Sequence, residues 1–117
     1  MIKISVCDDD EGQLTFFKQC FMEYNEKHEE KIEANFYQSV QSLLNEKKFS
    51  PDVYFLDIEL QDGNGLKLAG KIRTRNPQIP IVFITSHEEF MPEAFQVHAY
   101  QYLNEKKNAQ AVENVLN

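Results

Sequence analysis

The chain has 117 residues, 42% of them hydrophobic and 26% charged, with a formal net charge of −7. This length and composition indicate one folded domain with a real core, and the acidic balance argues against nucleic-acid binding by this segment alone, since phosphates are held by basic surfaces. Neither a secretory signal segment nor an apolar run of about 20 residues is present, so we expect a cytoplasmic protein that makes no membrane contact.

The first half of the chain begins with two strand–helix pairs. Residues 2–7 are mostly apolar and predict a strand, and apolar residues at helical spacing predict a helix at about 11–27. A second strand is expected at 32–37. Ser39 can cap a short helix that carries apolar residues between 40 and 44. The segment therefore starts as an alternating α/β pattern.

The middle of the chain continues the alternation. An apolar run at 53–56 predicts a third strand, and Asp-Gly-Asn-Gly at 62–65 is a turn signal. A third helix follows from Leu66 to about 76. The run at 81–84, opened by Pro80, predicts a fourth strand.

The last third has a weaker pattern. It predicts a helix at about 90–97 with Pro92 in its first turn, a strand at 100–103 and a helix from 109 to 116. Repeated strand–helix units form parallel sheets with right-handed crossovers and helices on both faces. We therefore expect a doubly wound α/β domain with a five-stranded sheet.

Polar residues follow three of the predicted strands. Asp8-Asp9-Asp10 follows the first strand, Asp57 the third, and Thr85-Ser86 the fourth. An acidic run alone is usually a solvated loop or a helix N-terminus, where negative charge is favourable. The carboxyl ends of parallel strands meet at one rim, however, and ligands of open α/β sheets bind there. The positions together favour one pocket of carboxylates with a hydroxyl beside it.

The residue types suggest the chemistry of that pocket. Neighbouring carboxylates repel one another unless a cation intervenes, and Mg²⁺ accepts carboxylate, water and phosphate oxygens. Asp57 could take up a phosphoryl group as an acyl phosphate, with Thr85 donating a hydrogen bond to one phosphoryl oxygen and a lysine pairing with another. On its own Thr85 would be interpreted as an ordinary strand residue.

These motifs resemble the receiver domain of two-component response regulators, over the whole chain. The matching segments are Cys7-Asp8-Asp9, Asp57-Ile58-Glu59-Leu60 with Gly65-Leu66, and residues 76–85. The resemblance implies a flavodoxin-like fold with strand order 2-1-3-4-5 and Asp57 as the phosphoacceptor. It implies a Mg²⁺ site formed by Asp9, which binds directly, by Asp8, largely through water, by Asp57 and by the backbone carbonyl of Glu59.

The same resemblance implies a biological role. The phosphoryl donor would be a sensor histidine kinase, and the domain would be a signalling switch rather than an enzyme, with intrinsic phosphotransfer and slow autodephosphorylation. Residues 94–103 resemble receivers that precede a LytTR-type DNA-binding domain, as in the LytR and AgrA group. We therefore expect a receiver at 1–117, dimerisation on phosphorylation, and transcriptional control through a C-terminal output domain outside this chain. The chain stops at Asn117 within a predicted helix that lacks an evident C-cap, which agrees with that expectation.

One departure from the family pattern concerns its active-site lysine. Three residues after the fifth-strand aromatic, Tyr102, the family has a lysine, and this chain has Glu105. Either a one-residue shift lets Lys106 contact the phosphoryl group, or the site lacks its lysine. Tyr102 is either the aromatic that moves during switching or a half-buried strand tyrosine.

Two rival functions are also compatible with the sequence. A degenerate receiver would keep the fold as an interaction module without phosphorylation, as Glu105 would favour. A Mg²⁺-dependent phosphohydrolase would use Asp57 as nucleophile, but it normally needs a second aspartate where this chain has Glu59. A flavin-binding domain is disfavoured because the acidic run at 8–10 would repel phosphate.

Cys7 and Cys20 are expected to be free thiols, typical of a reducing compartment.

Overall fold

A five-stranded parallel sheet forms the centre of the computed structural model, which describes residues 1–85, 88–103 and 108–116. Every neighbouring pair of strands in it is parallel, and the order is β2-β1-β3-β6-β7. The strands are β1 (Ile2–Cys7), β2 (Ile32–Tyr37), β3 (Val53–Leu56), β6 (Ile81–Ile84) and β7 (Gln101–Leu103). Because β6 and β7 are the fourth and fifth strands of this sheet, the predicted order 2-1-3-4-5 is confirmed.

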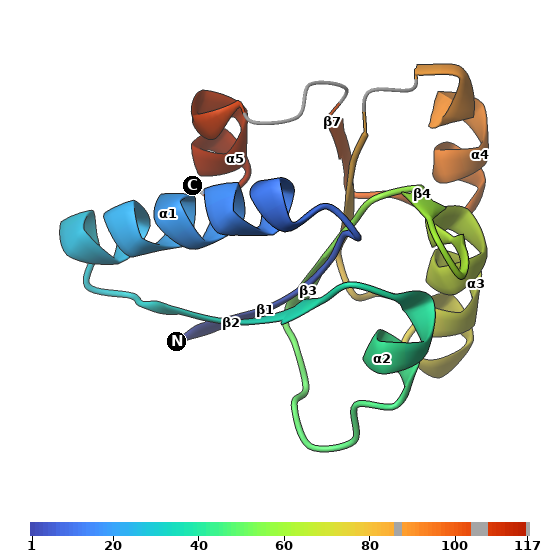
Figure 1. Ribbon diagram of the computed structural model, residues 1–117, viewed down its shortest axis with the longest axis horizontal. Helices are drawn as coiled ribbons and strands as arrows, with labels where there is room; N and C mark the ends of the chain where they lie inside the picture. Colours follow the sequence, from blue (N-terminus) through green and yellow to red (C-terminus); the bar gives the residue numbers. More distant parts are fainter. Residues whose placement is uncertain (86–87, 104–107, 117) are drawn as a thin grey trace.

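Helices cover both faces of the sheet (Figure 1). On one face lie α1 (Glu11–Lys27) and α5 (Ala109–Leu116). On the other lie α2 (Val40–Leu44), α3 (Gly65–Arg75) and α4 (Met91–Gln96), the last preceded by the 3₁₀ turn η1 (Glu88–Phe90). Each face has its own core cluster: Phe17 and Phe55 belong to the α1 side, and Leu68 and Phe83 to the α3 side. The doubly wound α/β architecture is therefore confirmed.

The helices begin where the local sequence provides caps. The side chains of Asp10, Ser39 and Asn64 accept hydrogen bonds from backbone amides in the first turns of α1, α2 and α3. Pro92 lies in the first turn of α4, where its missing N–H costs nothing. Among the described residues, no helix is both long and apolar enough to cross a membrane.

A short hairpin follows β3 that the sequence did not predict. Strands β4 (Glu59–Leu60) and β5 (Gly63–Asn64) pair antiparallel, so the predicted turn at 62–65 covers the end of their connection, β5 itself and the start of α3. Strands of two residues are too short to show a periodicity of two. The hairpin matters because it comes directly after Asp57 and leads the chain back into α3.

Candidate metal and phosphoryl site

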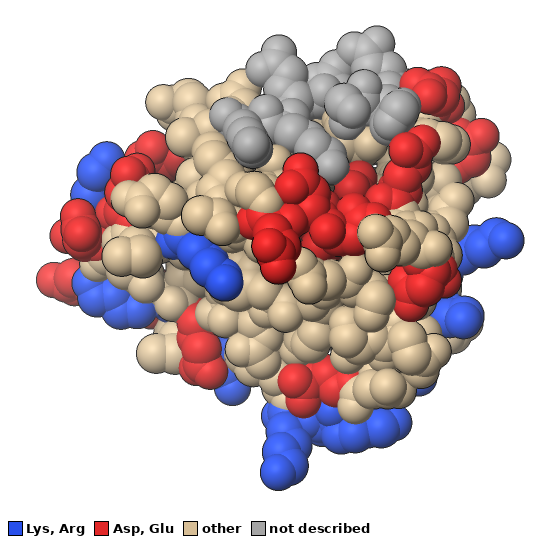
Figure 2. Space-filling view, viewed as in Figure 1, with Lys and Arg blue, Asp and Glu red and all other residues tan. Residues whose placement is uncertain are grey.

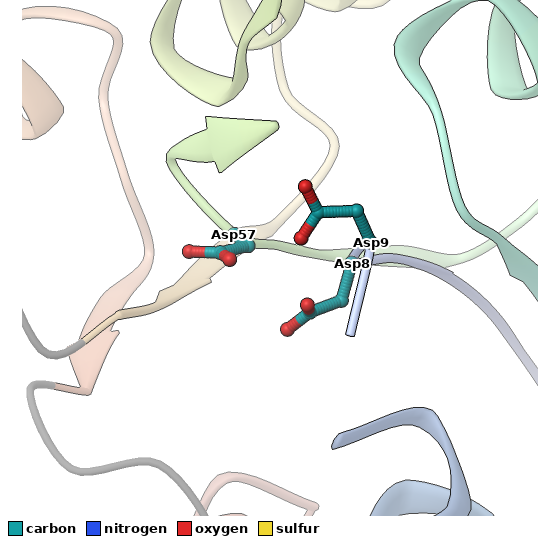
Figure 3. Close-up of side chains that lie close together, drawn as sticks. All are labelled: Asp8, Asp9 and Asp57. Atoms are coloured by element: carbon teal, nitrogen blue, oxygen red, sulfur yellow. The ribbon is translucent and has the colours of Figure 1, made fainter. Parts of the chain in front are cut away.

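Three aspartates meet at the carboxyl ends of β1 and β3. These strands are hydrogen-bonded neighbours, with Cys7 opposite Leu56, and the Asp57 amide donates to the Cys7 carbonyl oxygen at 2.9 Å. One carboxylate oxygen from each of Asp8, Asp9 and Asp57 lies within 4.8 Å of the others. Figure 3 shows the three side chains at these strand ends. The structure thus brings together three of the acidic residues that the sequence singled out, whereas the Asp10 side chain caps α1.

Backbone hydrogen bonds fix the orientation of two of these carboxylates. Asp57 Oδ1 accepts from the Ile58 amide at 2.8 Å, and Asp8 Oδ1 accepts from the Asp10 amide at 2.9 Å. Asp8 and Asp57 are buried, with 2% and 5% of their surface exposed, whereas Asp9 is half-buried. The site is therefore preorganised and remains accessible from the side of Asp9.

The site has a strongly negative electrostatic field. In Figure 2 acidic side chains gather in the middle of the face that is shown. The pKa of the neighbouring Cys7 thiol is raised to about 12, first by burial and then by nearby carboxylates: Asp62, Asp8, Asp57 and Asp9. Such a field favours a bound cation.

The cluster fits a hard divalent cation. Octahedral Mg²⁺ with bonds of about 2.0–2.1 Å holds its ligand oxygens about 3–4 Å apart, and the three carboxylate oxygens lie within 4.8 Å of one another. All donors are oxygens, as Mg²⁺ prefers.

The other predicted site residues that the structure describes are Thr85, Glu59 and Tyr102, and they lie outside the aspartate cluster. Thr85 follows β6, is fully buried, and its amide donates to the Leu103 carbonyl oxygen at 3.0 Å, so it stands on the same rim. The Glu59 side chain is exposed in β4. Tyr102 is half-buried in β7 opposite Phe83, with ring centroids 6.4 Å apart.

Glu105 and Lys106 are the two residues at or beside the position of the family lysine. Both lie outside the residues that the structure describes. The choice between a shifted lysine and a missing one therefore stays open.

Sequence reasoning missed one residue that supports the site. The Asp62 carboxylate, in the β4–β5 hairpin, accepts hydrogen bonds from the backbone amides of Val40 at 2.9 Å and Gln41 at 3.1 Å. These two bonds lower the pKa of Asp62. The contact spans more than 20 positions along the chain, so no local pattern signals it. It joins the hairpin after Asp57 to the first turn of α2.

With this geometry established, comparison with known proteins identifies the family. Residues 4–117 match the family model of the response regulator receiver domain, and the chain belongs to this family. A receiver domain is a signalling switch of two-component systems rather than an enzyme in the usual sense. The resemblance stated from the sequence is therefore confirmed.

Several known proteins are similar to this chain in sequence. An uncharacterized response regulatory protein of Yersinia pestis is 32% identical over 105 residues, which cover 88% of this chain and 42% of the relative. Accessory gene regulator protein A of Staphylococcus epidermidis is 34% identical over 108 residues, which cover 87% of this chain and 45% of that protein. Transcriptional regulatory protein LytR of Staphylococcus aureus is 32% identical over 66 residues, which cover 56% of this chain and 27% of LytR. The chain spans less than half the length of each of these relatives, which include the LytR and AgrA proteins expected.

Solved structures share the fold. The response regulator TrrA of Thermotoga maritima has a TM-score of 0.85 at 21% identity, with 99% of this chain and 96% of that one covered. A CheY-like receiver domain protein of Methanospirillum hungatei also has a TM-score of 0.85, at 18% identity, with coverage of 99% and 90%. Both comparisons support the receiver fold.

Proposed function

We propose that this receiver domain accepts a phosphoryl group on Asp57 from the phosphohistidine of a sensor histidine kinase. The observation that carries the proposal is the cluster of Asp8, Asp9 and Asp57, whose carboxylate oxygens lie within 4.8 Å of one another at two strand ends. A buried carboxylate in this position is a nucleophile whose charge needs a metal to balance it.

The proposed metal is Mg²⁺. Asp9 and Asp57 would bind it directly, Asp8 largely through water, and the backbone carbonyl of Glu59 would complete the protein ligands. When bound, Mg²⁺ would neutralise charge on the phosphoryl oxygens. The solved TrrA structure contains Mg²⁺ and a beryllium fluoride group, and this supports the proposal by analogy.

The transfer needs few protein groups. A carboxylate oxygen of Asp57 forms a bond to phosphorus, the P–N bond of the donor histidine breaks, and the imidazole leaves. Thr85 would donate a hydrogen bond to one phosphoryl oxygen, and Lys106 would contact another. Slow hydrolysis of the acyl phosphate by water would reset the domain.

Phosphorylation would change the surface beside β7. Movement of Thr85 toward the phosphoryl group, with Tyr102 following, would alter the face formed by α4, β7 and α5. Two aromatic side chains in this region are exposed: Phe95 in α4, 61% exposed, and Tyr100 directly before β7, 63% exposed. We assign this face to homodimerisation on phosphorylation.

The output domain would be part of a longer protein that contains this receiver. Residues 1–117 would be the receiver, followed by a C-terminal output domain, because the chain covers less than half of each relative described above. LytR is named a transcriptional regulatory protein, so we propose a DNA-binding output domain and transcriptional control. DNA would be contacted only through that domain.

Intact-mass measurement tests the proposal. The chain is incubated with acetyl phosphate or phosphoramidate, with and without Mg²⁺, alongside Asp57→Asn and Asp10→Asn. We expect a phosphate-sized mass gain that requires Mg²⁺, disappears in Asp57→Asn and persists in Asp10→Asn, whose side chain is outside the cluster. Absence of any gain in the wild type, with Mg²⁺ binding demonstrated, would contradict it.

That negative result would favour the second candidate, a degenerate receiver that acts as an interaction module. Glu105 at the family's lysine position is the observation behind it. An inward-facing glutamate would add negative charge and oppose phosphorylation. A Glu105→Lys variant that gains phosphorylation would then identify the cause.

A further inference from the structure

A second pocket lies under α2, away from the aspartate cluster. It is a cavity of about 240 Å³ between α2, α3 and the sheet, bordered by the segment that leads from α2 to β3. Figure 1 shows this segment as the loop below α2, and in the same view Figure 2 shows basic side chains at that lower edge. None of Asp8, Asp9 and Asp57 lines the cavity.

The cavity lining is mixed, and part of it is apolar. Leu43 and Leu44 of α2, Ile72 of α3 and the Phe49 ring contribute to it. Leu43 and Ile72 are also part of the buried core on this side of the sheet. An organic body rather than a bare ion would therefore fit against this wall.

Among the described residues, Glu46 is the one carboxylate that borders the cavity, and it is already engaged. Glu46 Oε1 accepts from the Tyr37 hydroxyl at 3.0 Å, and its Oε2 accepts from the Lys48 amide at 3.0 Å. These hydrogen bonds, the Lys48 amide first, lower the pKa of Glu46. Its negative charge is thus used within the protein.

The basic groups of the cavity differ from Glu46 in this respect. Arg75 and Lys47 line it, and neither side chain has a hydrogen bond or ion pair within residues 1–85, 88–103 and 108–116. The hydroxyl of half-buried Tyr54 likewise has no hydrogen-bond partner in those ranges. Arg75 is near enough to Tyr54 for its charge to oppose the larger effect of burial, which raises the tyrosine pKa. The lining therefore offers three uncommitted donors and a net positive charge in a protein of net charge −7.

We infer that this cavity is a binding site for a small organic oxyanion, a carboxylate or a phosphate monoester, that has an apolar body. The oxyanion would be held by Arg75 and the Tyr54 hydroxyl, with Lys47 at the rim, and the apolar body would contact Leu44 and Phe49. Pockets for drug-sized ligands have volumes of about 300–1,000 Å³, so this cavity suits a smaller molecule. The site is independent of phosphorylation at Asp57.

The test is a titration followed by two-dimensional ¹H–¹⁵N NMR without Mg²⁺, using benzoate, phenyl phosphate and benzyl alcohol as probes. We expect saturable shifts at the amides of Leu43, Leu44 and Tyr54 with at least one of the two anions, and binding of the uncharged alcohol about tenfold weaker. The tighter of the two anions would identify the ligand as a carboxylate or a phosphate ester.

Variants make the assignment specific. Arg75→Gln should weaken anion binding about tenfold, and Tyr54→Phe should weaken it less while keeping the ring. Lys71→Gln is the matched control, since this exposed cation is on the same helix but does not line the cavity. Equal binding of benzyl alcohol, unchanged affinity in a folded Arg75→Gln variant, or no saturable shift in the wild type at about 10 mM probe would each overturn the inference.

Discussion

A Cβ atom on Gly65 would lie 2.0 Å from the backbone carbonyl oxygen of Asp57. The chain leaves the site through the β4–β5 hairpin and returns to start α3 directly against the Asp57 peptide. There the Gly65 amide donates to the Ile58 carbonyl oxygen at 2.7 Å. Only glycine permits this approach, because the obstacle is backbone that cannot rotate away. The position of Asp57 therefore depends on Gly65.

Gly65→Ala should consequently destabilise the protein and displace Asp57. We expect a loss of about 2–4 kcal/mol in the free energy of unfolding, measured by urea denaturation, and a large fall in the rate of phosphorylation by acetyl phosphate. Gly70→Ala is the control, because a Cβ there meets nothing within 4 Å. That change in the interior of α3 should add about 0.5–1 kcal/mol. Similar effects of the two changes would contradict this account.

Charge repulsion among the three aspartates predicts how Mg²⁺ affects stability. Mg²⁺ should raise the melting temperature of the wild type, since a ligand that binds only the folded state stabilises it. Asp9→Asn should remove most of that increase and should stabilise the metal-free protein by about 1 kcal/mol by relieving repulsion.

Asp10→Asn makes the matched comparison. It removes the same charge from the adjacent position, and asparagine still caps α1. The Mg²⁺-dependent shift in melting temperature should persist in Asp10→Asn. Its loss in both variants would mean that Mg²⁺ responds to general surface charge rather than to the cluster.

The sheet and the acidic cluster could be predicted from the sequence because both follow from regular features. Buried parallel strands appear as short apolar runs such as 81–84, and parallel topology places the ends of all such runs on one rim. Asp8, Asp9 and Asp57 therefore came together as expected. Thr85 occupies that rim for the same reason.

Contacts between distant segments could not be predicted in this way. The Asp62 carboxylate binds amides of α2 that are more than 20 positions away, and the two-residue strands of its hairpin are too short to show a period. The close approach of Gly65 to Asp57 depends on how the hairpin returns. Such features depend on the assembled backbone and not on any local pattern.

The Arg73 guanidinium connects α3 to the end of α4. It donates to the carbonyl oxygens of Val97 and His98, both at 2.9 Å, and also to that of Ile79. His98 has a left-handed backbone with φ of 57°, an unusual conformation that these bonds help to hold. Arg73→Lys keeps the charge but loses the planar fork, so we expect a loss of about 1–3 kcal/mol in unfolding free energy.

Hydrogen exchange would locate this effect. In Arg73→Lys the amides of His98 and Ala99, which bond to the carbonyl oxygens of Phe95 and Ala94, should exchange faster than in the wild type. Arg75→Lys, on the same helix and without such bonds in the described ranges, should change stability by less than about 0.5 kcal/mol. Equal effects of the two substitutions would exclude the proposed role of Arg73.

The raised pKa of the Cys7 thiol predicts how stability changes at alkaline pH. In the unfolded chain the thiol has a pKa of about 8.5, whereas in the fold its pKa is about 12 because of burial and the nearby carboxylates. Between these values the unfolded state has lost a proton that the native state retains, so stability falls as pH rises, by at most about 1.4 kcal/mol per pH unit.

Cys7→Ala removes this contribution but loses packing at neutral pH. The stability advantage of the wild type over Cys7→Ala, measured by urea denaturation, should therefore shrink between about pH 9 and pH 11. Cys20→Ala should show a weaker trend, because Cys20 is only half-buried, and a constant wild-type advantage over Cys7→Ala would show that the thiol ionises normally in the fold.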